Sequence, residues 1–206
     1  MRTKARRVVV VVFDEVELLD VAAPLEVLST AGRRWNFRPY KVEVAAPQPG
    51  LVATRNQVRL EATFALSAVA PAEIVLVPGG YGARRFADDP TAIAELARIA
   101  AGAEIIAGIA GGVIALSRAG LIAGARVAAS KEMSATLEAE LPAAQLDLLT
   151  PVLDSGQLVT AATSGAALRL GLTLVARTMG PKLVAMVSAD LGLEEDPDKP
   201  RLEVRY

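Results

Sequence analysis

The sequence predicts an α/β fold, with a doubly wound and mostly parallel sheet sandwiched by helices. Two observations predict it. Short apolar runs at residues 8–13, 74–77 and 105–109 alternate with segments of helical spacing, as in parallel sheets that are buried on both faces. Glycine-rich turns follow the second and third runs, at the strand ends where open α/β folds bind ligands. The chain has 206 residues, 52% of them hydrophobic, so we expect one domain over residues 1–206 with its core at about 8–193.

The composition excludes several kinds of chemistry. The absence of Cys excludes disulfides, thiolate catalysis and Cys-ligated metals, and the absence of His excludes the usual general base and the commonest transition-metal ligand. No group of Asp and Glu residues has the spacing of a cation-binding loop, so we expect neither a metal nor a cofactor. A net charge of -1 provides no long-range attraction to nucleic acid or to an anionic membrane.

The chain begins with a basic stretch, residues 1–7, and a first strand is expected at residues 8–13. Six apolar residues are too few for a secretory signal or a membrane span, so we expect a cytoplasmic protein. A helix is expected at residues 21–32, with Asp20 as its N-cap and Pro24 in its first turn.

Three aromatic residues follow this helix. Because the spacing of Trp35, Phe37 and Tyr40 is irregular, we interpret them as a cover over the core rather than as part of a cofactor site. Residues 40–46 alternate in the manner of a strand and end in a turn. Residues 57–61 are expected to form a short edge strand or one arm of a hairpin.

The strand expected at residues 74–77 ends in the turn Pro-Gly-Gly-Tyr-Gly. Glycines there let backbone amides approach a ligand closely, although the turn also has a purely structural interpretation. It lacks the Lys and Ser/Thr of a phosphate-binding loop and does not fit the dinucleotide-binding fingerprint. Arg84 and Arg85 either guard the mouth of a pocket or form a surface pair, and the Asp-Asp-Pro that ends at Pro90 is expected to cap a helix at residues 91–101.

A strand, a sharp turn and a helix are expected at residues 105–109, 110–112 and 113–119. In α/β hydrolytic enzymes such a turn lifts one side chain above the sheet, and the first amides of the following helix form an oxyanion or anion site beside it. The lifted residue here is Ala110, whose methyl group offers no nucleophile, no proton and no metal affinity. The position where catalysis would be expected is therefore chemically empty.

The rest of the chain continues the alternation of strands and helices. We expect a strand at 125–129, a helix at 130–141, a hairpin of 149–153 and 158–163, helices at 166–179 and 182–191, and an irregular tail at 194–206. Ser130 and Ser164 are interpreted as helix caps rather than nucleophiles, because no base accompanies them. Lys131 is interpreted as part of a solvated helix face.

Four motifs, in this order, resemble those of the ThiJ/PfpI superfamily of class I glutamine amidotransferase-like proteins: VVVVVFDEVELLDVAAPLEVL, EIVLVPGGYG, IIAGIAGGVIALSRAGLIAG and TAATSGAALRLGLTLVARTMG. The likeness covers about residues 8–193. The segment LLDVAAP is most similar to the isonitrile (cyclohexyl-isocyanide) hydratase group and to the sensor domains of AraC-type regulators. The resemblance implies a flavodoxin-like sandwich with a nucleophile elbow, and commonly a homodimer.

The resemblance also implies roles for individual positions. The elbow Cys of the family falls on Ala110, and Gly111 keeps an amide for the oxyanion site. The acidic partner of that Cys falls on Asp20, and the glycine-rich loop provides a second amide. The His that follows the elbow helix in many members falls near Ser130. The ligand-binding positions implied in this way are Asp20, Gly79, Gly80, Tyr81, Ala110, Gly111 and Ser130.

Three functions stay open at this point. The one we favour is a pseudoenzyme that lacks the catalytic cysteine and binds a small anionic or polar metabolite. The second is an isonitrile hydratase-like lyase seen as an engineered Cys-to-Ala variant, since that chemistry needs a thiolate and the chain as written should not perform it. We favour natural loss because residues 128–130 have also diverged and no His remains.

The third is the ligand-sensing module of a transcriptional regulator, which is weakened because nothing after residue 193 is expected to form a helix-turn-helix. In every case the expected partner is a small molecule, with no direct contact to nucleic acid or membrane. A mean hydropathy of +0.38 is high for one small domain. We therefore expect a homodimer that forms through helix faces and residues 57–61.

Overall fold

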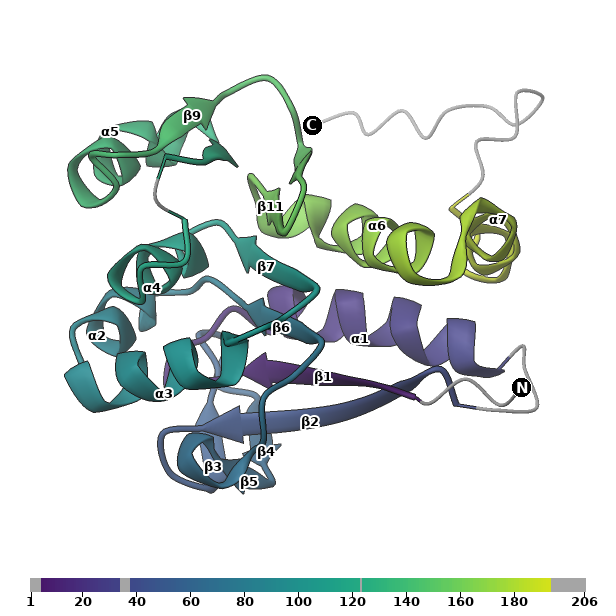
Figure 1. The fold of residues 1–206 in the computed structure, drawn as a ribbon, viewed down its shortest axis with the longest axis horizontal. Coiled ribbons are helices and arrows are strands. Elements are labelled where there is room, and N and C mark those ends of the chain that lie inside the picture. The colour runs from purple at the N-terminus through teal and green to yellow at the C-terminus, as the bar shows by residue number, and fades with distance from the viewer. Residues whose placement is uncertain (1–4, 34–37, 123, 194–206) are drawn as a thin grey trace.

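A seven-stranded sheet forms the centre of the part of the chain that the computed structural model describes, residues 5–33, 38–122 and 124–193 (Figure 1). The strand order is β10-β11-β7-β6-β1-β2-β5. The parallel strands are β1 (Arg6–Val11), β2 (Tyr40–Ala46), β5 (Phe64–Ala65), β6 (Ile74–Val77), β7 (Ile105–Ile109) and β11 (Leu158–Ala161), and β10 (Val152–Ser155) is antiparallel at one edge. This is the flavodoxin-like arrangement that the resemblance implied.

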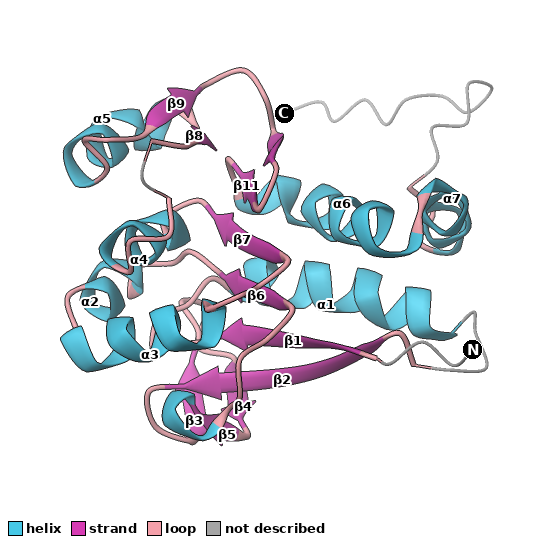
Figure 2. Cartoon of the chain, viewed as in Figure 1, coloured by secondary structure: helices cyan, strands magenta, loops and turns pink. Residues whose placement is uncertain are grey.

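Helices cover both faces of the sheet (Figure 2). One layer contains α1 (Leu18–Arg33), α6 (Ala167–Met179) and α7 (Pro181–Asp190), and the other contains α2 (Ala83–Ala87), α3 (Pro90–Ala100) and α4 (Gly112–Arg118). Every residue of β6 and β7 is buried between the layers, which explains why these strands are continuous apolar runs rather than alternating ones. In the first layer, Gly171 lets α6 approach α1 closely, because a Cβ there would lie 2.9 Å from Cβ of Val27.

The central strand β1 pairs with β2 on one side and with β6 on the other. The chain reverses its winding direction between β1 and β6, and open α/β folds bind ligands at such a point, beyond the carboxyl ends of the strands. The segments that lie there are residues 14–17, after β1, and residues 78–80, after β6. An isolated antiparallel bridge between Val16 and Gly80 joins them.

Two smaller pairs of strands flank the main sheet. The antiparallel hairpin of β3 (Gly50–Ala53) and β4 (Arg59–Ala62) lies near β2 and the edge strand β5. The parallel pair of β8 (Arg126–Ala128) and β9 (Gln145–Asp147) encloses α5 (Lys131–Glu140) in sequence and lies beyond α4 (Figure 1). Two short 3₁₀ helices, η1 (Leu66–Ala68) and η2 (Ser164–Ala166), complete the described elements.

Most elements expected from the sequence are present, within two or three residues of the expected ends. The N-cap expected before Pro90 is Asp89, whose carboxylate accepts hydrogen bonds from the amides of Thr91 and Ala92. The role expected for Asp20 is wrong: α1 begins at Leu18, so Asp20 lies inside its first turn and is not an N-cap.

Of the three aromatic residues expected to cover the core, Tyr40 is buried, and its hydroxyl lies 2.5 Å from that of Thr178. Trp35 and Phe37 lie outside the described residues, as does the tail at 194–206. None of the described helices is long and apolar enough to cross a membrane.

Candidate functional site

The turn between β7 and α4 has the geometry of an elbow. Ala110 occupies it with a φ of +46°, in the left-handed region that a residue with a Cβ rarely adopts and that costs about 1–2 kcal/mol. The turn is tightly packed, because a Cβ on Gly112 would overlap the carbonyl oxygen of Val77 and lie 2.6 Å from that of Pro78. The strained Ala110 is thus held between the end of β7 and the loop after β6.

The loop after β6 is equally constrained. Gly80 has a φ of +122°, and a Cβ there would overlap the carbonyl oxygen of Glu15 and lie 2.5 Å from the amide nitrogen of Glu17. The amide of Glu17 donates a 2.9 Å hydrogen bond to the carbonyl of Gly79. Only glycine fits at residue 80, and the glycine-rich loop is therefore fixed against the segment that follows β1.

Asp20 is fully buried in the first turn of α1. Its Oδ2 accepts a 2.8 Å hydrogen bond from the amide of Gly79. Its Oδ1 makes no hydrogen bond of normal geometry among the described residues, and the Ser164 hydroxyl lies close to the carboxyl without forming one. Burial raises the pKa of this carboxyl above its usual value of 3.8, and the charge of Glu17 adds to the rise. The Ser164 hydroxyl and the Gly79 amide oppose the rise without cancelling it. Burial therefore shifts Asp20 toward its protonated form, in which the carboxyl can donate a hydrogen bond.

These groups converge beside Gly79. The point where a Cβ of Gly79 would lie is 3.0 Å from Oδ2 of Asp20, 3.0 Å from the carbonyl oxygen of Ile109 and 3.2 Å from the amide nitrogen of Gly111. Within the described residues, the amides of Gly80 and Gly111 form no hydrogen bond. The structure thus brings together Asp20, the glycine-rich loop and the elbow, and this elbow site presents hydrogen-bond donors with no partner among the described residues.

The side chain of Tyr81 is exposed, and a role for Tyr81 in ligand binding stays a prediction. The ring is 67% exposed and the guanidinium of Arg55 lies 4.2 Å from its centre. Arg55 in turn forms a 3.1 Å ion pair with Glu17. The contact between Arg55 and Tyr81 therefore links the β3–β4 hairpin to the rim of the elbow site. The spacing of residues in the sequence does not predict this contact.

Arg84 and Arg85 form ion pairs rather than a free cationic mouth. Arg85 contacts Glu15 at 2.7 Å, and Arg84 contacts Glu140 of α5 at 2.8 Å. Both arginines are exposed, in agreement with the surface interpretation. Glu140 was not among the predicted residues, because a glutamate near the end of a polar helix gives no sign of burial in the sequence.

The two serines have different surroundings. Ser130 caps α5, as expected, by accepting a 3.3 Å hydrogen bond from the amide of Met133. Met133 links Ser130 to the elbow site, since its Cε lies 4.0 Å from the point where a Cβ of Gly111 would be. Ser164 lies beside Asp20 at the start of η2 and is close enough to influence its pKa. A role for Ser130 in ligand binding stays a prediction.

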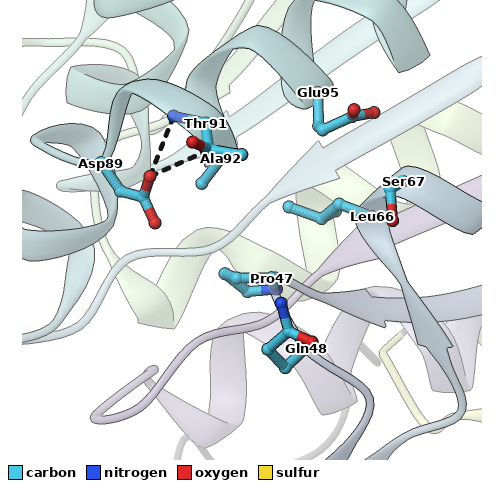
Figure 3. Close-up of a pocket in the computed structure, with 8 residues that line it drawn as sticks. All are labelled: Pro47, Gln48, Leu66, Ser67, Asp89, Thr91, Ala92 and Glu95. Atoms are coloured by element: carbon cyan, nitrogen blue, oxygen red, sulfur yellow. Dashed lines mark hydrogen bonds between the residues drawn. The ribbon is translucent and has the colours of Figure 1, made fainter.

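A second hollow lies away from the elbow site, between the N-terminus of α3 and the segments after β2 and β5 (Figure 3). It is an open pocket of about 310 Å³. Its lining residues are Pro47, Gln48, Leu66, Ser67, Asp89, Thr91, Ala92 and Glu95. The two charged residues among them are acidic, and Asp89 already occupies the first free amides of α3. This pocket shares no residue with the elbow site.

No group of three or more His, Cys, Asp or Glu side chains in residues 5–33, 38–122 and 124–193 could hold a metal ion.

Comparisons with known proteins agree with this geometry. A ThiJ/PfpI family protein from Pseudomonas syringae is 20% identical in sequence, with a TM-score of 0.81 over 96% of this chain and 78% of that one. Drosophila melanogaster DJ-1beta is 22% identical, with a TM-score of 0.78 over 91% and 98%. An AraC family transcriptional regulator from Pseudomonas putida is 21% identical, with a TM-score of 0.78 over 90% and 99%. At these identities the likeness establishes the fold.

No curated protein sequence matches the chain. The DJ-1/PfpI family, by contrast, matches residues 6–177, which include the elbow, the glycine-rich loop and Asp20. The fold, the strained turn at Ala110 and the match over most of the sequence lead to one conclusion: the chain belongs to the DJ-1/PfpI family.

Proposed function

We propose that this protein is a pseudoenzyme of the DJ-1/PfpI family that binds a small carboxylate or similar anion at the elbow site without transforming it. The chain contains no Cys and no His, so neither a thiolate nucleophile nor an imidazole base is present. Ala110 occupies the strained turn, where the resemblance to the family implies a cysteine. The frame of a reactive site is thus kept while its nucleophile is missing.

The observation that carries the proposal is the buried Oδ1 of Asp20, which has no hydrogen-bond partner among the described residues. A buried polar atom without a partner costs free energy, about 1–3 kcal/mol, and a ligand that supplies the partner removes that cost. In the protonated form that burial favours, Asp20 is a donor, as are the amides of Gly80 and Gly111. Three donors suit a group that only accepts hydrogen bonds, and a carboxylate is such a group.

The experiment is a titration of the ¹⁵N-labelled protein with acetate and formate, read from the amide resonances of Gly80 and Gly111. We expect saturable shifts at these two amides and none at the amides of Thr91 and Ala92, which already bind Asp89. The Asp20→Asn variant keeps a donor and should still bind, whereas Asp20→Ala should bind about tenfold more weakly. Shifts that stay linear in ligand concentration, or that appear equally over the whole surface, would contradict the proposal.

The same protein can be incubated with cyclohexyl isocyanide to test for hydratase activity. Because attack on the isonitrile carbon needs a thiolate, we expect no N-cyclohexylformamide above the buffer control. Formamide produced by the protein as it stands would favour the lyase function instead.

We further propose that the chain forms one domain, acts in the cytoplasm and associates as a homodimer. Support for the dimer comes from the β3–β4 hairpin, where Leu51 is 64% exposed and Val58 is 45% exposed. Exposed apolar side chains that share a hairpin are typical of surfaces covered by a partner. The hairpin includes most of the region expected at residues 57–61.

A further inference from the structure

Strand β8, helix α5 and strand β9 form one segment, residues 126–147, the α5 unit. It lies beyond α4, outside the seven-stranded sheet (Figure 1). Within α5 itself, only Leu137 and Glu140 are buried. A helix with so little apolar burial depends on specific contacts for its position.

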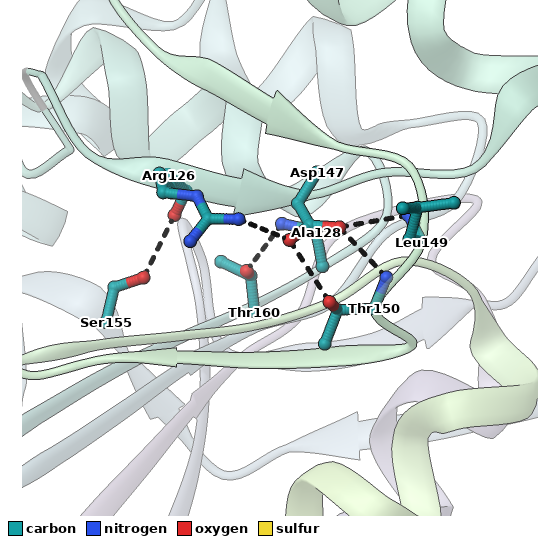
Figure 4. Close-up of polar contacts among 7 residues, drawn as sticks. All are labelled: Arg126, Ala128, Asp147, Leu149, Thr150, Ser155 and Thr160. Carbon is teal, nitrogen blue, oxygen red and sulfur yellow. Dashed lines mark hydrogen bonds and ion pairs between the residues drawn. The ribbon is translucent and has the colours of Figure 1, made fainter.

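One end of the α5 unit is anchored on the main sheet (Figure 4). The amide of Ala128 donates a 2.9 Å hydrogen bond to the hydroxyl of the buried Thr160 in β11, and the hydroxyl of Ser155 in β10 donates to the carbonyl of Arg126 at 3.3 Å. Asp147 closes the loop after β9 through bonds from Arg126 and from the amides of neighbouring residues (Figure 4). These contacts hold β8 and β9, but none of them reaches the C-terminal end of α5.

That other end is held by Glu140. Its side chain is 7% exposed and lies between two arginines, with Oε1 2.8 Å from Arg84 of α2 and Oε2 2.6 Å from Arg118 of α4. Arg118 also donates a 3.3 Å hydrogen bond to the backbone carbonyl of Glu140. A single buried carboxylate therefore ties three helices together.

The opposite end of α5 contacts the elbow site. Met133, two turns and about 10 Å before Glu140, brings its Cε to 4.0 Å from the Cβ position of Gly111. On another side of the same point, Cβ of Ala83 in α2 lies 3.6 Å away. The helices that wall Gly111 are thus α2 and α5, and the ion pair between Arg84 and Glu140 joins these two helices.

We propose that Glu140 is a positioning residue that holds α5 against α2 and α4, so that Met133 forms one wall of the elbow site. Its effect on ligand affinity rests on the proposed function, whereas its effect on the position of Met133 does not. Without the carboxylate, α5 keeps its hinge on β11 and loses the contact that fixes its far end. Met133 lies between this hinge and Glu140, so a pivot of α5 about the hinge moves its methyl group relative to Gly111, and a ligand at the elbow site loses part of its cover.

The test compares Glu140→Gln with Glu138→Gln in the full chain. Both changes remove one negative charge from α5, but Glu138 is exposed and Glu140 is buried. In Glu140→Gln we expect amide exchange in α5 to be about tenfold faster, with unchanged exchange in β6 and β7. We also expect the ¹³C resonance of the Met133 ε-methyl to move toward that of an exposed methionine. Glu138→Gln should match the parent in both measurements.

Acetate affinity separates this proposal from the proposed function. If the parent binds acetate, Glu140→Gln should bind acetate several-fold more weakly, while the thermal stability of the sheet stays the same. Loss of an ion pair with a purely structural role would not weaken acetate binding in this way. If the parent binds no acetate while the Met133 resonance still moves, the proposed function fails and the positioning role of Glu140 stands. An unchanged Met133 resonance and unchanged α5 exchange would overturn the positioning role.

A second variant keeps the test decisive if Glu140→Gln does not fold. Arg84→Gln removes an arginine that is 66% exposed and leaves the carboxylate paired with Arg118. Arg84→Gln should shift the Met133 resonance in the same direction as Glu140→Gln, by a smaller amount. Arg85→Gln is its control, because Arg85 pairs with Glu15 and not with Glu140. Equal spectra for these two variants would overturn the proposal.

Discussion

The amide of Gly79 donates a 2.8 Å hydrogen bond to Oδ2 of Asp20, which joins two segments that are 59 residues apart in the sequence. The bond fixes the first turn of α1 against the loop after β6. It also leaves Oδ1 of the same carboxyl without a partner among the described residues. The stability of the fold and the chemistry of the elbow site therefore depend on the same side chain.

Asp20 should make stability depend on pH. A carboxyl whose pKa is raised by folding contributes its full stability below its unfolded pKa, here near 3.8, and loses it as the pH rises through the folded pKa. Asp20→Asn stays neutral at every pH. The variant should therefore be more stable than the parent at pH 7, and the difference should shrink as the pH falls toward 4. Urea unfolding at a series of pH values measures this difference.

Asp88→Asn is the matched control, because it makes the same change on an exposed side chain near the start of α3. Its stability relative to the parent should vary little over the same range. A parent that is more stable than Asp20→Asn at pH 7 would mean that the ionised carboxylate is favoured in the folded state.

Gly80→Ala should be strongly destabilising. The new Cβ would overlap the backbone at Glu15 and would impose a φ of +122° on a residue that has a side chain. Strain of this kind costs about 1–3 kcal/mol, and the overlap adds to it, so we expect a loss of about 3 kcal/mol or more in urea unfolding. Gly165→Ala is the control: its Cβ would meet only the Thr163 hydroxyl at 3.7 Å, so its stability should change by less than about 1 kcal/mol. Equal losses in the two variants would show that the loop after β6 can relax.

Much of the fold was predictable because the relevant signals are local. The apolar runs of β1, β6 and β7 are strands that are buried on both faces, and short β-branched runs are typical of such strands. The cap at Asp89 was predictable for the same reason, since Asp before Pro at a helix start satisfies free amides within three residues. The strand β9 was missed because Leu146 is its one apolar residue, which gives no period to detect.

The candidate site was predictable only where the family motifs lie. The start of α1 was misplaced because the apolar Leu18 and Leu19 precede an acidic residue that resembles an N-cap. The carboxyl of that residue instead accepts a hydrogen bond from Gly79, in a loop far away in the sequence. The burial of Glu140 likewise depends on Arg84 and Arg118, which belong to different helices. Such contacts depend on tertiary packing, and no periodicity in the sequence encodes them.

The proposed dimer should depend on the hairpin. Leu51→Asp places a charge on a residue that is 64% exposed in one chain and that would be buried between two. We expect the parent to sediment as a dimer at micromolar concentration and Leu51→Asp to shift toward monomer, because an unpaired charge at an apolar interface is costly. Leu149→Asp changes a residue that is 90% exposed and far from the hairpin, and it should leave the dimer intact. A monomeric parent would reject the dimer, and a dimeric Leu51→Asp would exclude this surface.

The final prediction tests whether the elbow can still support a thiolate. Ala110→Cys introduces the only cysteine of the chain, so alkylation reports on that thiol alone. The unpaired amides of Gly80 and Gly111 favour the thiolate and should bring the thiol pKa below its usual value of about 8.5. Asp20 disfavours the thiolate if it is ionised, and it helps only as the protonated donor that its burial favours.

The measurement is the pH profile of the alkylation rate in Ala110→Cys, with Ala70→Cys on an exposed loop as the control that should titrate near the usual value. If Asp20 is protonated in Ala110→Cys, adding Asp20→Asn should change the thiol pKa little, because a neutral donor replaces another. A further fall in the double variant would instead mean that Asp20 is ionised beside the sulfur. The thiol at position 110 could instead have a pKa at or above that of the control, or fail to react. Either result would mean that Ala110 is ordinary core packing and that the elbow no longer has amides that stabilise an anion. Even a reactive thiol need not restore isonitrile hydration, since the segment at residues 128–130 differs from the one that the resemblance implies.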